Sequence, residues 1–202
     1  MRAFVAIDLP EKIRSALSRK QAELRDSLAK MNRDTGKQDP EIRWTKPEGI
    51  HLTLKFLGEI PQPRISQVIE SLSAIGAFES FPIEVKRFGF FPSALRPQVF
   101  WADVEAPPAL AHLAGDIEEA MEKIGFAPEK RNYSPHLTLA RFKNPRPRPE
   151  LRALVEAQSQ ISMGRFEAAE FFLFESKLSP HGAEYGRVAR FPDKTKTNDR
   201  AF

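Results

Sequence analysis

The tetrapeptide His-Leu-Thr-Leu occurs twice in this chain, at His51–Leu54 and at His136–Leu139. Side chains alternate between the two faces of a β-strand, so each copy would present an imidazole and a hydroxyl on one face and two leucines on the other. Histidine titrates near neutral pH and can therefore both donate and accept a proton. Two such strands side by side would bring His51, Thr53, His136 and Thr138 together for acid–base chemistry on a phosphate.

The repetition of this pattern is what carries the functional interpretation. A single His-x-Thr in a strand is most often a solvated or packed pair of residues. Here the match extends over four residues, and each copy continues through a strand into a loop, at Gly58–Pro63 and at Lys143–Pro149. The agreement of both motifs and their flanks favours a functional pair. Acid–base work on one phosphate would require the two imidazoles to lie about 5–8 Å apart.

The composition sets the frame for such a site. A chain of 202 residues with 41% hydrophobic residues and 16 phenylalanines can bury a substantial core. We expect one bilobal domain over residues 1–192, whose lobes share that core, and a polar, disordered tail over 193–202. The formal net charge of +4 and a pI near 9.4 suit an anionic ligand.

Several classes of protein are disfavoured by the same data. No apolar run is long enough to span a bilayer, and no charged-then-apolar signal segment opens the chain. The absence of cysteine excludes disulfides and thiolate metal sites and fits a cytoplasmic location. Neither motif histidine has a second ligand at helical or hairpin spacing, so we expect no metal and no cofactor.

Hydrophobic spacing predicts the elements that must position the motifs. Helices are expected to open at Pro10, near Pro63, at Pro108 and around Leu151. Strands are expected at 2–8, 42–45, 51–57, 83–91, 98–105, 137–142, 165–176 and 184–191. Several strands are hairpin-like neighbours, so the pattern indicates an α+β fold with antiparallel sheets and helices packed outside.

Five segments resemble one known superfamily. The run Arg43–Thr45 with His51–Gly58 resembles the first signature of the 2H phosphoesterases, specifically of their RNA 2′,3′-cyclic phosphodiesterase (2′-5′ RNA ligase) branch. Pro135–Arg141 is similar to the second signature. Arg2–Pro10 resembles the N-terminal strand of that branch, and Leu173–Tyr185 resembles its closing hairpin. The resemblance extends over nearly the whole chain.

The resemblance implies a fold and a reaction. The fold is bilobal, with two antiparallel sheets related by a pseudo-two-fold axis that flank a central cleft. The reaction is metal-independent opening of a 2′,3′-cyclic phosphate at an RNA end to give a 2′-phosphate, with reversible 2′-5′ ligation as an accompanying activity. Following the family, His51 is the proton donor and His136 the proton acceptor. Thr53 and Thr138 would stabilise the charge that builds on the phosphoryl oxygens.

Three further residues are candidates for binding substrate. Arg141 lies an odd number of positions after His136, so only a bulge or a strand end would bring it onto the phosphate. Lys55 shares parity with His51 and would line the cleft. Tyr185 is suited to stacking on a base.

Alternative functions remain open at this point. The expected partner is RNA with a 2′,3′-cyclic phosphate end, such as a tRNA fragment or a nucleotide, bound by a monomer with no membrane involved. The same catalytic residues would also serve a 2H phosphodiesterase acting on 2′-5′-linked oligoadenylate or on small cyclic nucleotides. A non-enzymatic RNA-binding module would fit the basic pI but gives no reason for the repeated motif.

Overall fold

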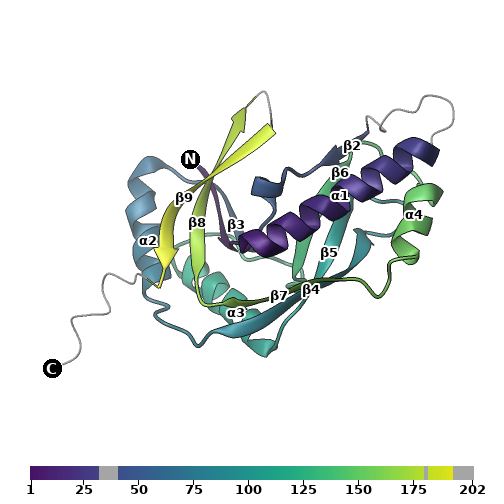
Figure 1. The fold of residues 1–202 in the computed structure, drawn as a ribbon. Coiled ribbons are helices and arrows are strands. Elements are labelled where there is room, and N and C mark those ends of the chain that lie inside the picture. Colours follow the sequence, from purple (N-terminus) through teal and green to yellow (C-terminus); the bar gives the residue numbers. More distant parts are fainter. Residues whose placement is uncertain (32–40, 180–181, 193–202) are drawn as a thin grey trace.

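Strands dominate the fold, and helices connect the strands of its two halves (Figure 1). The computed structural model describes residues 1–31, 41–179 and 182–192. The strands are β1 (Arg2–Ile7), β2 (Ile42–Trp44), β3 (Leu52–Glu59), β4 (Phe81–Phe91), β5 (Val99–Glu105), β6 (His136–Phe142), β7 (Ser162–Ala168), β8 (Phe171–Ser179) and β9 (Gly182–Phe191). The helices are α1 (Glu11–Met31), α2 (Ile65–Ser73), α3 (Pro108–Lys123) and α4 (Pro149–Glu156), with 3₁₀ turns η1 (Pro47–Gly49) and η2 (Gln62–Arg64).

The sheet consists of two similar halves that meet at the motif strands. One half has the order β3-β1-β8-β9 and the other the order β6-β5-β4-β7, with all neighbours antiparallel. The halves are joined by the residue pair Leu52–Leu137 between β3 and β6, and β2 adds to β6 alone. The α+β class and the antiparallel pairing are therefore confirmed, and the two expected sheets are continuous with each other at this junction.

The helices exchange between the halves. Helix α1 follows β1 of the first half but packs on β7 and α4 of the second, whereas α3 follows β5 of the second half and packs on β3 of the first. Figure 1 shows α1 and α4 together on one side and α2 and α3 together on the other. Each helix buries a stripe at helical spacing, Ile13, Leu17 and Leu24 in α1 and Leu113, Ile117 and Met121 in α3.

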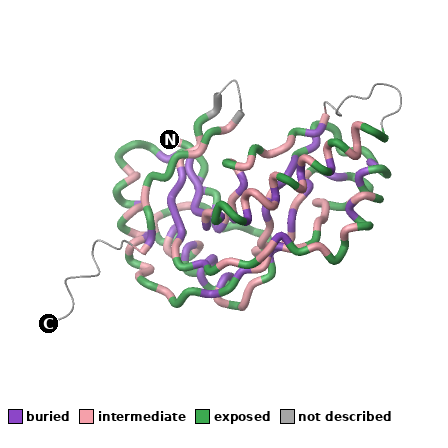
Figure 2. Tube along the Cα trace, viewed as in Figure 1, coloured by how far each residue is buried: buried purple, intermediate pink, exposed green. Residues whose placement is uncertain are grey.

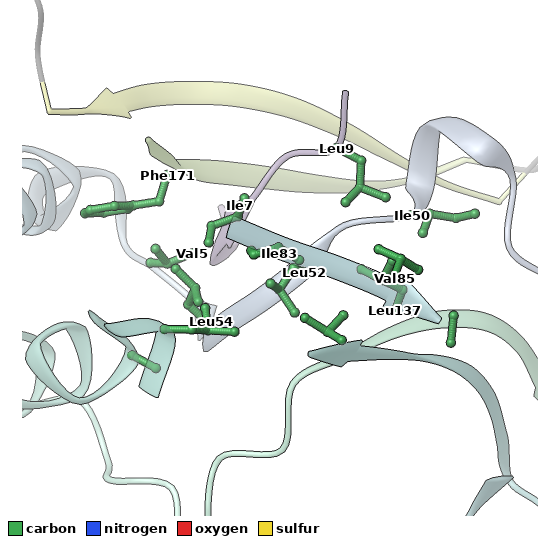
Figure 3. Close-up of a cluster of buried hydrophobic side chains, with 14 of the residues drawn as sticks. Val5, Ile7, Leu9, Ile50, Leu52, Leu54, Ile83, Val85, Leu137 and Phe171 are labelled. Carbon is green, nitrogen blue, oxygen red and sulfur yellow. The ribbon is translucent and has the colours of Figure 1, made fainter. Parts of the chain in front are cut away.

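One hydrophobic cluster extends through both halves (Figure 3). Val5 of β1, Leu52 of β3, Leu137 of β6 and Val85 of β4 belong to it, and all four are fully shielded from solvent. Burial follows the strands of the sheet, as the tube in Figure 2 shows. Full burial of a leucine side chain contributes about 1.5–3 kcal/mol. The leucines of the two motifs therefore anchor the strands that carry the histidines.

The predicted elements agree with the structure except in one region. The expected strand over 165–176 is two strands, β7 and β8, which lie in different halves of the sheet. The break falls at Ala169 and Glu170, where the sequence has no glycine or proline to mark it. The predicted tail over 193–202 lies outside the described residues. No helix in the described part of the chain is long and apolar enough to cross a membrane.

Candidate active site

The junction between the two halves brings the two His-x-Thr motifs together. Leu52 pairs with Leu137 in antiparallel register. One residue further in each direction, this register sets His51 opposite Thr138 and Thr53 opposite His136. The two histidines then occupy diagonal positions, which lie about 7–8 Å apart in an antiparallel pair. All four polar side chains are half-buried. We call the side of the sheet that carries Thr53 and Thr138 the motif face.

Both imidazoles are oriented by the backbone in the same way. Nδ1 of His136 lies 2.8 Å from the carbonyl oxygen of Ser134, and the carbonyl of Gly49 accepts a hydrogen bond from the ring of His51. Each carbonyl belongs to the residue two positions before the histidine. In His136 this bond places a proton on Nδ1 and leaves Nε2 for exchange with a substrate.

His51 is packed against aromatic rings. Phe4 stacks on it with ring centroids 4.4 Å apart, Tyr185 meets it edge-on at 5.1 Å, and Phe174 lies at 6.2 Å. Phe4 and Phe174 belong to a small apolar cluster on this side of the sheet, separate from the main core. Stacked rings hold the imidazole in one orientation and exclude water from its face.

The surroundings of His51 lower its pKa strongly. Burial lowers the pKa of His51 from 6.5 to about 4, and the positive charges of Arg14 and Arg141 act in the same direction. The hydrogen bond to Gly49 and the carboxylate of Asp8 oppose this shift without cancelling it. His51 is therefore neutral at pH 7 in the unliganded protein.

His136 lies in a less enclosed position. One aromatic ring, Phe91, meets it edge-on at 5.0 Å. Burial lowers its pKa, the hydrogen bond to Ser134 raises it, and the charge of Arg141 lowers it further. The net shift is downward from 6.5, so His136 is also neutral at pH 7 and available as a proton acceptor.

A bulge in each motif strand decides which residues share the motif face. Strand β1 pairs Ala6 with Thr53 and Val5 with Lys55, so Leu54 is an extra residue in β3. Strand β5 pairs Trp101 with Thr138 and Phe100 with Ala140, so Leu139 is an extra residue in β6. A one-residue bulge reverses the faces of the residues that follow it.

The bulge places Arg141 on the motif face. Arg141 pairs with Val99, which lies two residues from Trp101 on β5 and therefore on the same face as Trp101 and its partner Thr138. The guanidinium is exposed, and its charge acts on the pKa of both histidines. The structure thus supplies the bulge on which the interpretation of Arg141 as a phosphate ligand depended.

The bulge at Leu54 in β3 turns Lys55 away from the motif face. The prediction that Lys55 lines the cleft rested on unbroken alternation after His51, and the bulge at Leu54 breaks it. The side chain is only 3% exposed, and Nζ lies 2.5 Å from Oε1 of Glu118 in α3 and 3.1 Å from the carbonyl oxygen of Ala127. Phe56 takes the position on the motif face instead and is 66% exposed.

Tyr185 contacts His51. Besides His51, its ring meets Phe4 edge-on at 5.3 Å and packs over Gly49, where an added Cβ would lie 3.1 Å from it. A pocket of about 300 Å³ opens beside it, lined by Asp8, Glu11, Arg14, Pro47, Glu48, Phe174, Tyr185 and Arg187. Tyr185 therefore lines the candidate site beside His51. Its expected stacking on a base stays a prediction.

An arginine that the sequence did not single out fixes the loop before His51. Arg14 Nη1 donates to the carbonyl of Pro47 at 2.6 Å and to that of Ile50 at 3.3 Å, and Nη2 lies 2.6 Å from Asp8 Oδ1. Burial alone would raise the pKa of Asp8, but the hydrogen bond from Arg187 and the charge of Arg14 lower it on balance. Asp8 is thus a stable anion that holds Arg14 against the η1 turn.

The described residues contain no group of three or more histidine, aspartate or glutamate side chains placed to hold a metal ion. The groups present at the site are two imidazoles, two threonines and an arginine. These can exchange protons and donate hydrogen bonds to an anion held between the motifs.

The chain is similar in sequence and in structure to known proteins. The model of the family described as LigT like Phosphoesterase matches residues 7–101 and 103–185. An RNA 2′,3′-cyclic phosphodiesterase of Methanothermobacter thermautotrophicus is 32% identical over 186 residues, which cover 92% of this chain and 95% of that protein. The crystal structure of TT0787 of Thermus thermophilus superposes with a TM-score of 0.74 at 27% identity, covering 95% of this chain and 97% of that one.

A structure with a bound nucleotide is also similar. Escherichia coli LigT complexed with 3′-AMP superposes with a TM-score of 0.71 at 25% identity, covering 94% of this chain and 96% of that one. The family model spans both His-x-Thr motifs. Its match begins at Ile7, the last residue of β1, and ends at Tyr185 within β9, so Phe4 lies just before it. On these matches, the chain belongs to the LigT-like family of 2H phosphoesterases.

Proposed function

We propose that this protein opens 2′,3′-cyclic phosphates at RNA ends and leaves a 2′-phosphate. The observation that carries the proposal is the antiparallel junction at Leu52–Leu137, which gathers both His-x-Thr motifs beside one arginine. A relative that matches nearly the whole chain is named RNA 2′,3′-cyclic phosphodiesterase, which supports the proposal. The site needs no metal in this mechanism, because the two imidazoles supply both proton transfers.

The reaction requires an in-line displacement at phosphorus. Neutral His136 takes a proton from water through Nε2 as the water oxygen bonds to phosphorus. The bond from phosphorus to O3′ breaks, and protonated His51 gives its proton to O3′. The phosphate remains on O2′, and the two histidines have exchanged protonation states, which solvent restores.

Negative charge on the phosphoryl oxygens grows during this step. The hydroxyls of Thr53 and Thr138 are placed to donate to the non-bridging oxygens, and the guanidinium of Arg141 adds a positive charge on the same face. An RNA hydroxyl replacing water as the nucleophile would form a 2′-5′ bond at the same site. Weak ligation is therefore part of the proposal.

The low pKa of His51 shapes its role as the donor. An imidazolium in a dry aromatic setting is a strong acid, which suits protonation of a departing alkoxide. The same setting keeps His51 neutral before substrate arrives. A bound phosphate anion raises the pKa of a neighbouring imidazole by direct attraction, so substrate itself favours the protonated form.

The test is turnover of an oligoribonucleotide that ends in a 2′,3′-cyclic phosphate, with products resolved as 2′- or 3′-phosphate. We expect 2′-phosphate alone, at a rate unchanged by exhaustive chelation. A 2′-5′-linked oligoadenylate and a 2′,3′-cyclic mononucleotide run in parallel separate the related substrates. No turnover of the RNA, or release of a 3′-phosphate, would refute the proposal.

A further inference from the structure

The bulge at Leu139 is held by a buried side chain from a distant helix. Gln21 of α1 is 3% exposed, within a stripe that is otherwise apolar. Its Nε2 donates to the carbonyl of Leu139 at 2.8 Å and to the carbonyl of Thr45 at 2.9 Å. The backbone N–H of Thr45 donates to the same Leu139 carbonyl at 2.8 Å. Both hydrogens of the amide nitrogen are therefore used at the bulge.

Leu139 lies where β6 changes its neighbour. Residues Ala140–Phe142 pair with β2, whereas Leu137 pairs with β3. The carbonyl of Leu139 already accepts a hydrogen bond from the backbone N–H of Thr45, and its second lone pair can accept one more. The glutamine supplies this second donor and also donates to the carbonyl of Thr45, so it links the bulge in β6 to the residue that follows β2. A buried amide in an apolar stripe is retained only when its hydrogen bonds are satisfied, and here they are.

The other half of the molecule has a counterpart. Glu118 lies ten residues after Pro108, the first residue of α3, and Gln21 lies ten residues after Glu11, the first residue of α1. Glu118 accepts from Nζ of Lys55, the residue that follows the bulge in β3. Each exchanged helix thus carries one polar side chain that bonds to the bulged segment of a motif strand.

We propose that Gln21 is a positioning residue of the phosphate site. By fixing the bulge at Leu139, it keeps Arg141 on the motif face, and without the bulge Arg141 would turn towards the core side with Leu137. Helix α1 thereby determines which side chain faces the substrate anion from β6. The catalytic consequence rests on the proposed function, whereas the placement of Arg141 beside the histidines does not.

A double-mutant cycle tests the catalytic consequence. Gln21→Met keeps the length of the side chain and removes its donors. If Gln21 acts through Arg141, kcat/KM on the cyclic-phosphate RNA should fall about 10–100-fold, the scale of one lost hydrogen bond to a charged group. In an Arg141→Ala background the same change should cost less than about threefold. Equal losses in both backgrounds would overturn the proposal.

A measurement without substrate separates this proposal from the proposed function. Because the charge of Arg141 lowers the pKa of both histidines, Arg141→Ala should raise both pKa values in an NMR titration of the imidazole rings. Gln21→Met should raise them too, while Leu24→Ala, a destabilising change in the same buried stripe, should not. Unchanged histidine titrations in Gln21→Met would refute the positioning role even if the RNA is turned over.

A second variant guards against misfolding. Gln21→Asn keeps the amide but withdraws it by one methylene, so it should shift the titrations in the same direction if the reach of the amide matters. Shifted titrations together with no turnover by the wild type would retain the positioning role and reject the proposed reaction.

Discussion

The two motif histidines have the same backbone setting but different surroundings. Each follows a carbonyl that accepts its ring N–H, and each precedes a threonine and a bulge. His51, however, is enclosed by Phe4, Phe174 and Tyr185, whereas among the described residues His136 has a ring contact with Phe91 alone. The pseudo-two-fold relation therefore holds for the backbone, while desolvation separates the two histidines chemically.

The residues that follow the motifs differ in the same manner. Five positions after each histidine, the motif face carries Phe56 in one half and Arg141 in the other. Directly after each bulge, the buried residue is Lys55 in one half and Ala140 in the other. Two strands with the same bulged backbone thus present an apolar side chain in one half and a cationic side chain in the other.

The largest effect is expected from replacing the histidine of each motif, which tests whether both halves of the sheet are needed for catalysis. His51→Ala and His136→Ala should each lower kcat/KM on the cyclic-phosphate RNA by about 10²–10⁴, the usual scale for a general acid or base. The double variant should be little worse than the poorer single one, because the two groups act together. His112→Ala on the exposed side of α3 is the matched control. Full activity in either single variant would leave that half without a catalytic role.

Replacing the threonine of each motif should have a smaller effect than replacing the histidines, and the effect should be similar in the two halves. Thr53→Val and Thr138→Val keep the side-chain shape and remove the hydroxyl, so each should lower kcat by roughly 10–10³ if it stabilises developing charge. Melting temperatures measured alongside should change little. If instead the threonines are present for strand propensity, valine would serve equally well and kcat would stay at the wild-type value.

The pH dependence should separate the histidines most finely. Since burial lowers both pKa values, and that of His51 to about 4, the bell-shaped profile of kcat/KM should centre below pH 6.5 rather than at neutrality. Phe4→Leu removes the stacked ring and should raise the pKa of His51 in an NMR titration while leaving His136 unchanged. Equal titration of the two histidines in the wild type would remove the distinction drawn between them.

The sign of the linked stability effect follows from the same shift. A histidine whose pKa is lowered in the folded protein binds fewer protons there than in the unfolded chain between pH 4 and 6.5. Its contribution to stability is present above pH 6.5 and is lost as the pH falls towards 4. The melting temperature of His51→Gln should therefore decline less between pH 7 and pH 5 than that of the wild type.

The sequence was sufficient to predict the strands that carry the two motifs and the α+β class, because these depend on local pattern and on hydrophobic spacing. The sequence could not determine which face of the sheet carries the residues that follow Thr53 and Thr138. Lys55 was predicted on the motif face and Arg141 off it unless a bulge intervened, and both outcomes depended on one extra residue in each strand. Such bulges are fixed by tertiary partners. Gln21 and Glu118 are 118 and 63 residues from the groups they bind, and nothing local marks them.

The exchange of helices has a consequence for how the molecule is assembled. Helix α1 belongs by connection to one half and by packing to the other, and α3 does the reverse. Strand β4 leaves the first half for the second, and β8 returns. Neither half is a contiguous piece of chain, so neither can be cut out as an autonomous folding unit. The candidate site lies at the junction of the two halves, so its residues come together only after strands from both halves have paired.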